Sequence, residues 1–338
     1  MTKFNMDNWL NSLISTNEKK SMPLLSFPSI SKLGCTVKDL VTSSDLQAKG
    51  MKLVADQTPS LASVSFMDLS VEAEAFGSNV EFAENDVPTI IGSLITSIED
   101  AENLAVPPIG AKRTGIYIDA VKKAKELIVD RPIFAGIIGS FSLAGRLLDV
   151  TEALVCCYTE PELVHSVLQK CTGFLIEYAK AYKKAGANGI IIAEPLTGLL
   201  SPELASEFSE PYIKRISSAV KDENFAVIYH NCGNTTLKIM DSILKTNCSA
   251  YHFGNAVDMK EVLKIVPKDV IVMGNIDPVS QFKNGSVDSI KTQVTNLLEE
   301  CKDYSNFVIS SGCDIPHDAN WQKIHAYYQA IKEFYKGV

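Results

Sequence analysis

Three side chains that commonly bind metals, His230, Cys232 and Cys313, stand at the ends of short apolar runs in this sequence of 338 residues. His230 and Cys232 end the run 226–232, and Cys313 ends the run 307–313. If the first run is a strand, His230 and Cys232 share one face of it, because side chains alternate along a strand. One imidazole and two thiolates are a common ligand set of catalytic zinc sites, which keep the fourth position free for a substrate. The sequence therefore predicts zinc chemistry on a small molecule.

The spacing of these residues is weak evidence by itself, since 5 His and 8 Cys in one chain can give a His-x-Cys pair by composition alone. Their placement at predicted strand ends, together with the separate Cys313, strengthens the metal interpretation. Zinc is favoured over iron or copper because the ligand set mixes sulfur with imidazole.

The composition is typical of a compact protein with a large core, because 46% of the residues are hydrophobic and 21% are charged. The formal net charge of −8, with no basic stripe, argues against a nucleic acid or an anionic membrane as the partner. No apolar run reaches the roughly 20 residues of a membrane helix, and the N-terminus lacks a signal-peptide pattern. Eight cysteines without paired spacing indicate reduced thiols, so we expect a cytoplasmic protein.

Eight short apolar runs alternate with longer segments of helical periodicity, and this alternation predicts an α/β fold. The runs are residues 22–27, 61–66, 133–138, 189–193, 225–229, 250–253, 270–273 and 307–310. They are rich in Val, Ile, Leu and Phe and are closed by Gly, Pro, Asp or Asn, as buried parallel strands tend to be.

Eight strand–helix units favour a closed (β/α)8 TIM barrel over an open sheet. We expect a single domain over residues 1–338, with residues 1–20 as an N-terminal helical extension. A dinucleotide-binding fold is disfavoured because the sequence contains no G-x-G-x-x-G motif.

Polar residues gather at the carboxyl ends of the predicted strands, where barrels of this kind carry their active sites. They are Asp68, Ser140, Glu194, His230, Cys232, His252, Asn275, Asp277 and Cys313. Asp68 and Asp277 can instead cap the helices that follow them, and His252 can be a hydrogen-bonded core residue. Glu194 follows the run Gly-Ile-Ile-Ile-Ala directly, so its carboxylate must find a partner or a cavity.

Several motifs together resemble the uroporphyrinogen decarboxylase superfamily and, within it, the zinc-dependent corrinoid methyltransferases. They are Ser-Phe-Met-Asp at 65–68, Glu-Ala-Phe-Gly at 74–77, Gly-Ser-Phe-Ser-Leu-Ala-Gly at 139–145, Gly-Asn-Ile-Asp-Pro at 274–278 and Gly-Cys-Asp-Ile-Pro at 312–316. The resemblance covers most of the chain and implies a (β/α)8 barrel, in agreement with the strand count.

The departures from the decarboxylase pattern bear on the activity. The segment 22–34, where a decarboxylase carries arginines that bind the substrate carboxylates, contains one Lys and no Arg. Arg146 stands near the position of an expected pocket tyrosine, Cys313 replaces an expected histidine, and Asp68 is retained. A tetrapyrrole with eight carboxylates would meet too little positive charge, so the resemblance favours the methyltransferase branch.

In that branch, the family pattern implies zinc on His230, Cys232 and Cys313. The methyl group passes either from a methylcobamide to a thiol such as coenzyme M, or from a donor such as an aromatic methyl ether to cob(I)amide. The resemblance further implies catalytic roles for Glu194 and Asp68, with Glu194 as a fourth zinc ligand while substrate is absent. His252, Asp277, Asn275 and Ser140 are then expected to contact the substrate or to support the ligands.

The sequence contains no corrinoid-binding module, so the corrinoid is expected on a separate partner protein. Two alternatives stay open at this point. The first is a decarboxylase of the uroporphyrinogen type, and the second is a non-catalytic barrel that uses zinc to anchor a ligand.

Overall fold

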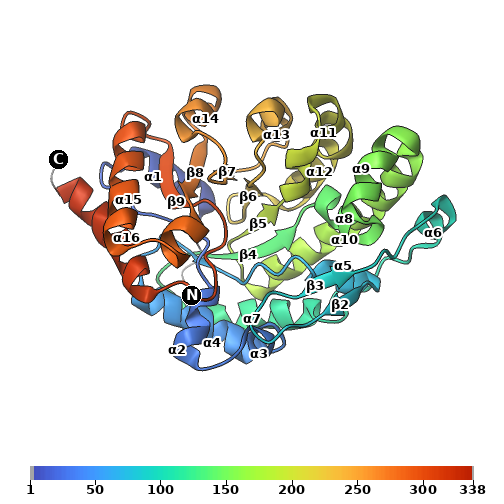
Figure 1. Ribbon diagram of the computed structural model, residues 1–338, viewed down its shortest axis with the longest axis horizontal. Coiled ribbons are helices and arrows are strands. Elements are labelled where there is room, and N and C mark those ends of the chain that lie inside the picture. Colours follow the sequence, from blue (N-terminus) through green and yellow to red (C-terminus); the bar gives the residue numbers. More distant parts are fainter. Residues whose placement is uncertain (1–3, 337–338) are drawn as a thin grey trace.

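The computed structural model describes residues 4–336, and its central feature is a parallel sheet of seven strands curled into a half-barrel (Figure 1). In their order across the sheet, the strands are β1 (Ser63–Val64), β4 (Ile133–Ile138), β5 (Gly189–Ala193), β6 (Ala226–Asn231), β7 (Ala250–Phe253), β8 (Ile271–Ile276) and β9 (Phe307–Ser311). Every residue of these strands is buried, as expected where helices cover a parallel sheet. The strands β2 (Asn79–Glu81) and β3 (Thr89–Ile91) form a separate antiparallel pair.

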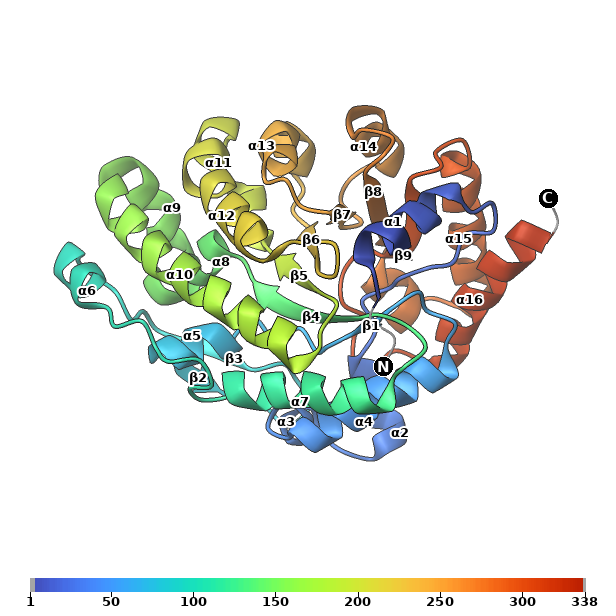
Figure 2. The same cartoon turned by 180° about the vertical axis from the view of Figure 1, so that it is seen from behind.

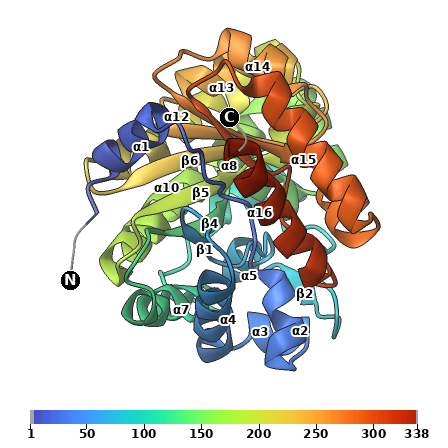
Figure 3. The same cartoon turned by 90° about the vertical axis from the view of Figure 1, so that its left-hand side faces the viewer.

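Helices line the outer face of the sheet in an arc that Figures 1 and 3 show from two sides. The α-helices are α1 (Met6–Ser15), α2 (Ile30–Leu33), α3 (Val37–Val41), α4 (Ser44–Gln57), α5 (Val71–Phe76), α6 (Ile98–Asn103), α7 (Thr114–Leu127), α8 (Ser140–Leu148), α9 (Val150–Thr159), α10 (Pro161–Ala185), α11 (Pro202–Phe208), α12 (Glu210–Val220), α13 (Met240–Lys245), α14 (Met259–Ile265), α15 (Val287–Cys301) and α16 (Trp321–Lys336). Short helical turns are η1 (Phe27–Ser29), η2 (Pro195–Leu199), η3 (Thr236–Ile239) and η4 (Pro278–Lys283). None of the helices within residues 4–336 is long and apolar enough to cross a membrane.

The predicted N-terminal helix is present as α1, and it covers the inner face of the curled sheet at one end (Figure 2). Met6 and Leu13 of α1 pack against inward-facing strand residues such as Phe134, Ile191 and Ile228. The Met6 N–H also donates to the Glu223 carbonyl at 2.6 Å. Apolar packing therefore fills the interior at this end of the sheet, and the carboxyl ends of the strands lie at the other end.

The expected eighth strand over residues 22–27 is wrong, and a closed eight-stranded barrel is not observed among the described residues. The segment contacts both edge strands without forming a regular backbone ladder. Met22 N–H donates to the Ile309 carbonyl of β9 at 3.3 Å, the other bonds to β9 use the hydroxyls of Ser310 and Ser311, and Ser26 Oγ donates to the Val64 carbonyl of β1 at 2.5 Å. Pro23 has no N–H to donate, which prevents a continuous ladder. The seven other predicted strands are present, with ends that differ from the predicted ones by at most three residues.

Candidate metal centre

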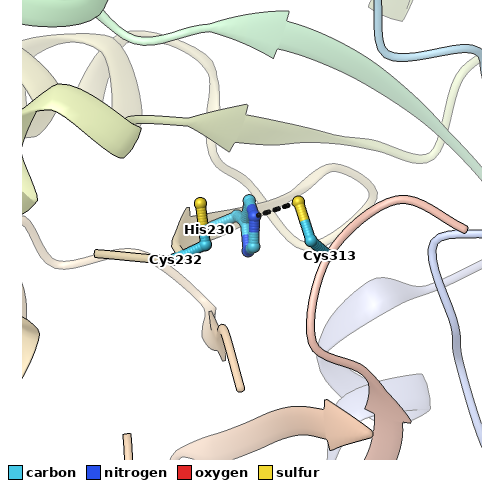
Figure 4. A group of neighbouring side chains, drawn as sticks. All are labelled: His230, Cys232 and Cys313. Atoms are coloured by element: carbon cyan, nitrogen blue, oxygen red, sulfur yellow. Dashed lines mark hydrogen bonds between the residues drawn. The ribbon is translucent and has the colours of Figure 1, made fainter. Parts of the chain in front are cut away.

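His230 lies in β6, Cys232 follows this strand, and Cys313 follows β9 on the other side of the half-barrel. Their ligand atoms all lie within 4.8 Å of one another, and Cys313 Sγ is 3.7 Å from His230 Nε2. In Figure 4 the imidazole of His230 lies between the two cysteine side chains. Zinc with Zn–S bonds of about 2.3 Å and Zn–N bonds of about 2.0 Å holds its tetrahedral ligand atoms about 3.5–3.8 Å apart. The three side chains therefore fit zinc with only small movements.

Strand geometry explains why these three side chains converge. Ile228 belongs to the interior apolar cluster, so His230 and Cys232, two and four residues further on, point to the same interior. Gly254 lets the chain after β7 pass against Cys232, since a Cβ at Gly254 would lie 2.6 Å from the Cys232 Cα. The absence of a side chain at residue 254 thus keeps Cys232 in position.

The two thiols share their protons unequally. A hydrogen bond from the Cys313 thiol, together with the His230 ring, stabilises the Cys232 thiolate and lowers the pKa of Cys232. The same contact with Cys232, together with burial, raises the pKa of Cys313. One thiolate therefore forms readily, whereas the second requires a positive charge between the two sulfurs, which is the condition that a divalent cation meets.

A chain of hydrogen bonds lies behind His230. His230 Nδ1 is 2.8 Å from His252 Nδ1, and His252 Nε2 is 2.8 Å from Ser310 Oγ. Ser310 Oγ in turn donates to the Met22 carbonyl at 2.7 Å. His252 is the residue opposite His230 on the neighbouring strand β7, so the strand register places the two rings side by side.

This chain of hydrogen bonds fixes which nitrogen of His230 is free. Ser310 uses its only hydrogen on Met22, so it must accept from His252 Nε2–H. Burial and the neighbouring imidazole lower the pKa of His252 well below its usual value, so this ring is neutral and its Nδ1 is an acceptor. His230 then donates through Nδ1–H, so Nε2 is the nitrogen that faces the cysteines. A proton on Nε2 stabilises the Cys232 thiolate, and without that proton Nε2 offers its lone pair to a metal. A hydrogen bond of this kind, to the second nitrogen of a ligating histidine, is typical of metal sites.

A cavity of about 80 Å³ adjoins the three candidate ligands. Its other lining residues are Leu24, Met67, Leu69, Ala193, Pro195 and Asp314. The wall is thus mostly apolar, and Asp314 is its one acid, with a pKa that burial raises well above the usual range. Such a cavity can shield a small reactant from water next to a metal.

Glu194 is fully buried, but its carboxylate points away from this cavity, which its neighbours Ala193 and Pro195 line. It accepts hydrogen bonds from Phe141 N–H at 3.1 Å and Ser142 N–H at 2.6 Å, at the N-terminus of α8. Burial raises the pKa of Glu194 to about 7. The structure therefore shows Glu194 bonded to the start of a helix, and its expected role as a fourth ligand stays a prediction.

Asp68 is arranged in the same way, since Met67 and Leu69 line the cavity on either side of it. Its carboxylate pairs with Arg113, accepts from Ser70 Oγ at 2.5 Å and from Tyr117 Oη at 3.2 Å, and is almost fully buried. These contacts use the carboxylate within the protein, and its catalytic role stays a prediction.

The remaining predicted residues also bond within the protein, and none of them lines the cavity beside the ligands. Asn275 donates to the carbonyls of Gly254 and Val257. Asp277 caps η4, and Ser140 contacts Thr172 at 2.9 Å. Their expected contact with a substrate stays a prediction, and His252 has the supporting position described above.

Sequence reasoning missed Ser310, Asp314 and Arg113. Asp314 directly follows a candidate ligand, which is a signal that could have found it. Ser310 could have been found only with the register between β7 and β9, because its partner His252 is 58 residues away. Arg113 precedes a helix that the sequence does not connect with Asp68.

The sequence profile of the uroporphyrinogen decarboxylase (URO-D) family matches residues 27–334. A methylcobamide:CoM methyltransferase, MtbA, of Methanosarcina acetivorans is 31% identical over 266 residues, which are 76% of this chain and 76% of that protein. A uroporphyrinogen decarboxylase of Chlorobium luteolum is 29% identical over 286 residues, which are 80% of this chain and 79% of that protein. Among solved structures, a methyltransferase from Methanosarcina mazei has a TM-score of 0.87 and 23% identity, with 98% of this chain and 99% of that chain covered. The last likeness establishes a common fold.

Proposed function

The chain belongs to the uroporphyrinogen decarboxylase family, and we propose that it is a zinc-dependent methyltransferase acting between a corrinoid protein and a small substrate. The observation that carries this proposal is the cluster of His230, Cys232 and Cys313 beside a cavity, with three ligand atoms and room for a fourth. A structural zinc site would normally close with four protein ligands. The names of the methyltransferase relatives support the corrinoid as the methyl carrier.

The metal would be held by the two sulfurs and by His230 Nε2, which the hydrogen bond to His252 leaves free. Zinc bound by two thiolates and a neutral imidazole would favour the thiolate form of a substrate thiol near neutral pH. The apolar walls formed by Leu24 and Met67 would shield that sulfur from water. The two cysteines must lose their protons when the metal binds, so loading should release protons to solvent.

The proposed methyl transfer is a nucleophilic displacement. In the direction toward a thiol, the substrate S–H loses its proton to solvent and its sulfur forms a bond to the methyl carbon of the methylcobamide. The cobalt–carbon bond breaks, and its electron pair stays with cobalt. In the opposite direction, cob(I)amide takes the methyl group from a methylated donor. The cavity of about 80 Å³ beside the candidate ligands is smaller than an apolar cavity of about 150 Å³ that is known to bind benzene, so it suits a small thiol better than an aromatic methyl ether.

Charge argues against decarboxylation of a polycarboxylate. The segment before α3 that would bind carboxylates contains Lys32 as its one cation, and this side chain is bonded to Gln57 on the surface. Arg113, the buried arginine near Asp68, is paired with both Asp68 and Glu74. A non-catalytic zinc-anchored barrel remains the second alternative, and it differs in predicting no turnover.

The test combines metal analysis with two activity assays. We expect about one zinc per chain, and transfer of the methyl group of methylcobalamin to a small thiol, followed by the change in corrinoid absorbance. Protein with well under one zinc per chain that cannot be loaded would remove the basis of the proposal. Decarboxylation of uroporphyrinogen would instead establish the first alternative. Zinc binding with no methyl transfer to a thiol, none from a methyl ether to cob(I)alamin and no decarboxylation would establish the second.

A further inference from the structure

Asn231 stands between the candidate ligands His230 and Cys232 in the sequence, and its side chain lies on the opposite face of β6. Because His230 and Cys232 point to the interior, the alternation of side chains directs Asn231 toward the outer face of the sheet. Asn231 is fully buried and is not among the residues that line the cavity. A role of Asn231 at the metal centre must therefore act through its neighbours.

The Asn231 side chain continues the contact between β5 and β6 where the backbone ladder stops, since β6 ends at this residue. Ala226 N–H donates to the Asn188 carbonyl, and each further rung of a parallel ladder lies two residues on along both strands. In this register, the rung beyond the end of β6 would join Cys232 N–H to the Glu194 carbonyl. Asn231 Nδ2 donates to that carbonyl at 2.7 Å. The carboxamide thus ties the end of β6 to the end of β5 next to Cys232.

The oxygen of the same carboxamide closes a turn around Cys232. Asn231 Oδ1 accepts from Gly233 N–H at 2.9 Å, which is the arrangement of an Asx-turn with Cys232 as its central residue. Thr236 Oγ1 lies 2.7 Å from Asn231 Oδ1 and 2.6 Å from the Gly233 carbonyl. The Glu194 carbonyl can only accept and Gly233 N–H can only donate, so the two bonds fix which end of the carboxamide is nitrogen.

This turn packs against the loop after β5 through a contact between two glycines. A Cβ at Gly233 would lie 2.7 Å from Gly198 Cα, so a side chain at residue 233 would push the two loops apart. Thr235 Oγ1 also donates to the Gly198 carbonyl. Gly198 belongs to η2, and Pro195, the first residue of η2, lines the cavity. The turn that carries Cys232 is therefore held against the loop that forms one wall of the cavity.

We propose that Asn231 is a positioning residue for the metal ligand Cys232, because its carboxamide fixes the turn that directs this sulfur toward the other two candidate ligands. His230 is held by backbone rungs to both β5 and β7. Cys232 lies beyond the strand, and the Asn231 side chain supplies the bonds that fix its turn. A ligand that is already held in place loses less conformational freedom when the metal binds, so the metal is bound more tightly. This inference rests on the proposed function only for the presence of the metal.

The test compares two variants that remove different parts of the Asn231 network. Asn231→Leu keeps the approximate volume of the side chain without its hydrogen bonds, and Asn231→Ser keeps an oxygen that can accept from Gly233 N–H. Zinc affinity is measured by competition with a chelator, and cobalt(II) bound in place of zinc reports the ligand geometry through its visible absorption. We expect Asn231→Leu to bind zinc roughly 10- to 100-fold more weakly than the wild type, with altered cobalt(II) bands. Asn231→Ser should lose less affinity.

Asn306→Leu is the matched control, because Asn306 is also a buried asparagine that bonds to backbone carbonyls. It directly precedes β9, at the amino end of the sheet, and donates to the Pro267 carbonyl at 3.2 Å and to the Val270 carbonyl at 2.8 Å. Asn306→Leu should lower stability in denaturant unfolding, and it should leave the zinc affinity and the cobalt(II) spectrum unchanged.

An unchanged zinc affinity and cobalt(II) spectrum in both Asn231 variants would overturn the inference, and so would an equal loss of affinity in Asn306→Leu. If Asn231→Leu does not fold, Asn231→Ser decides by the same two measurements. Methyl transfer by a wild type whose zinc affinity does not depend on Asn231 would overturn this inference alone. Zinc binding that depends on Asn231, in a protein that transfers no methyl group, would support this inference and overturn the proposed methyl transfer alone.

Discussion

Two clusters of polar side chains follow strands of the same sheet. They differ in how many of their polar atoms already have a partner within the protein. Around Asp68, a buried carboxylate is paired with Arg113 and bonded to Ser70 and Tyr117, and Arg113 also pairs with Glu74. Around His230, two thiols and one imidazole nitrogen face each other, with a cavity beside them. The first, which we call the closed cluster, has its charges and hydrogen bonds paired without a ligand. The second, which we call the open cluster, needs a cation to pair its ligand atoms.

This difference distinguishes side chains that stabilise the fold from side chains that can bind a metal better than residue type does. An Asp and an Arg at a strand end resemble an active site in the sequence, yet here they tie the loop after β1 to the N-terminus of α7. The His230 cluster shows the opposite arrangement. Its hydrogen bonds run from His230 Nδ1 through His252 to Ser310, on the far side of the imidazole from the cysteines, and leave His230 Nε2 free to bind a metal. Open ligand atoms backed by satisfied supporting residues are the arrangement expected of a metal site.

The largest effect is expected from Cys313→Ala, which removes a ligand from the open cluster. Zinc should be lost, and methyl transfer should fall by more than about 100-fold, because even the loss of a supporting residue can cost 10- to 100-fold. The fold should survive, since Cys313 lies at the rim of the half-barrel and carries little of the core packing. Metal analysis, circular dichroism and initial rates measure the three effects.

Cys35→Ala is the matched control, because Cys35 is also a free, partly exposed cysteine and lies outside the cluster. It should keep zinc and activity. Full methyl transfer by Cys313→Ala would show that the open cluster is not the site of the reaction.

Arg113→Met tests the closed cluster and should act on stability. The Asp68 side chain is fully inaccessible and would lose its charged partner, so we expect the free energy of unfolding to fall by about 3–5 kcal/mol. Zinc content should stay at the wild-type level in the folded protein. Denaturant unfolding of Arg113→Met, and of Asp68→Asn combined with Arg113→Met, measures the effect, and the double variant should recover part of the loss.

An Arg113→Met protein with normal stability and no activity would reverse the comparison. This result would mean that the Asp68 cluster takes part in the reaction and does not stabilise the fold.

His252→Phe tests the support behind the open cluster. The variant removes the acceptor that holds His230 Nδ1–H, so His230 Nε2 is no longer fixed as the free nitrogen. Zinc affinity should fall roughly 10- to 100-fold, as measured by competition with a chelator. Ser310 is one hydrogen bond further from the metal centre than His252, so Ser310→Ala should lower the zinc affinity less. An unchanged zinc affinity in His252→Phe would make the His252 ring a packing residue only.

The sequence was sufficient to predict the convergence of His230 and Cys232, because a period of two fixes which side chains share a face. It was not sufficient for Glu194, which ends the run Gly-Ile-Ile-Ile-Ala of β5. Both faces of that strand are buried and apolar, so the alternation that would reveal the direction of Glu194 is hidden. The strand register that pairs His230 with His252 depends on contacts between distant segments.

The eighth strand illustrates the same limit for the fold. Residues 22–27 have the apolar character of a strand, and they lie in contact with both β9 and β1. Pro23, and side-chain oxygens such as Ser311 Oγ, which accepts from Leu24 N–H at 3.0 Å, replace the regular backbone ladder. Composition predicts where such a segment packs more reliably than it predicts backbone hydrogen bonding.

The smallest effect concerns Glu72 of α5, a buried acid beside the closed cluster that forms no ion pair with any residue between 4 and 336. Its carboxylate accepts from Ile138 N–H at 3.0 Å, and burial raises its pKa from 4.5 to about 7. Between about pH 4.5 and 7 the folded protein holds a proton that the unfolded chain has released, so stability falls as pH rises through this window. One linked proton gives a slope of about 1.4 kcal/mol per pH unit at most.

Glu194, whose pKa is also raised to about 7, should add a similar slope. Glu72→Gln keeps the acceptor for Ile138 N–H and removes the proton, so its unfolding free energy should fall less steeply with pH between pH 5 and 7 than that of the wild type, by up to about 1.4 kcal/mol per pH unit. The exposed Glu81→Gln serves as the control and should leave the slope unchanged. A slope that Glu72→Gln leaves intact would show that Glu72 is charged in the folded protein and that the closed cluster supplies it with a compensating charge.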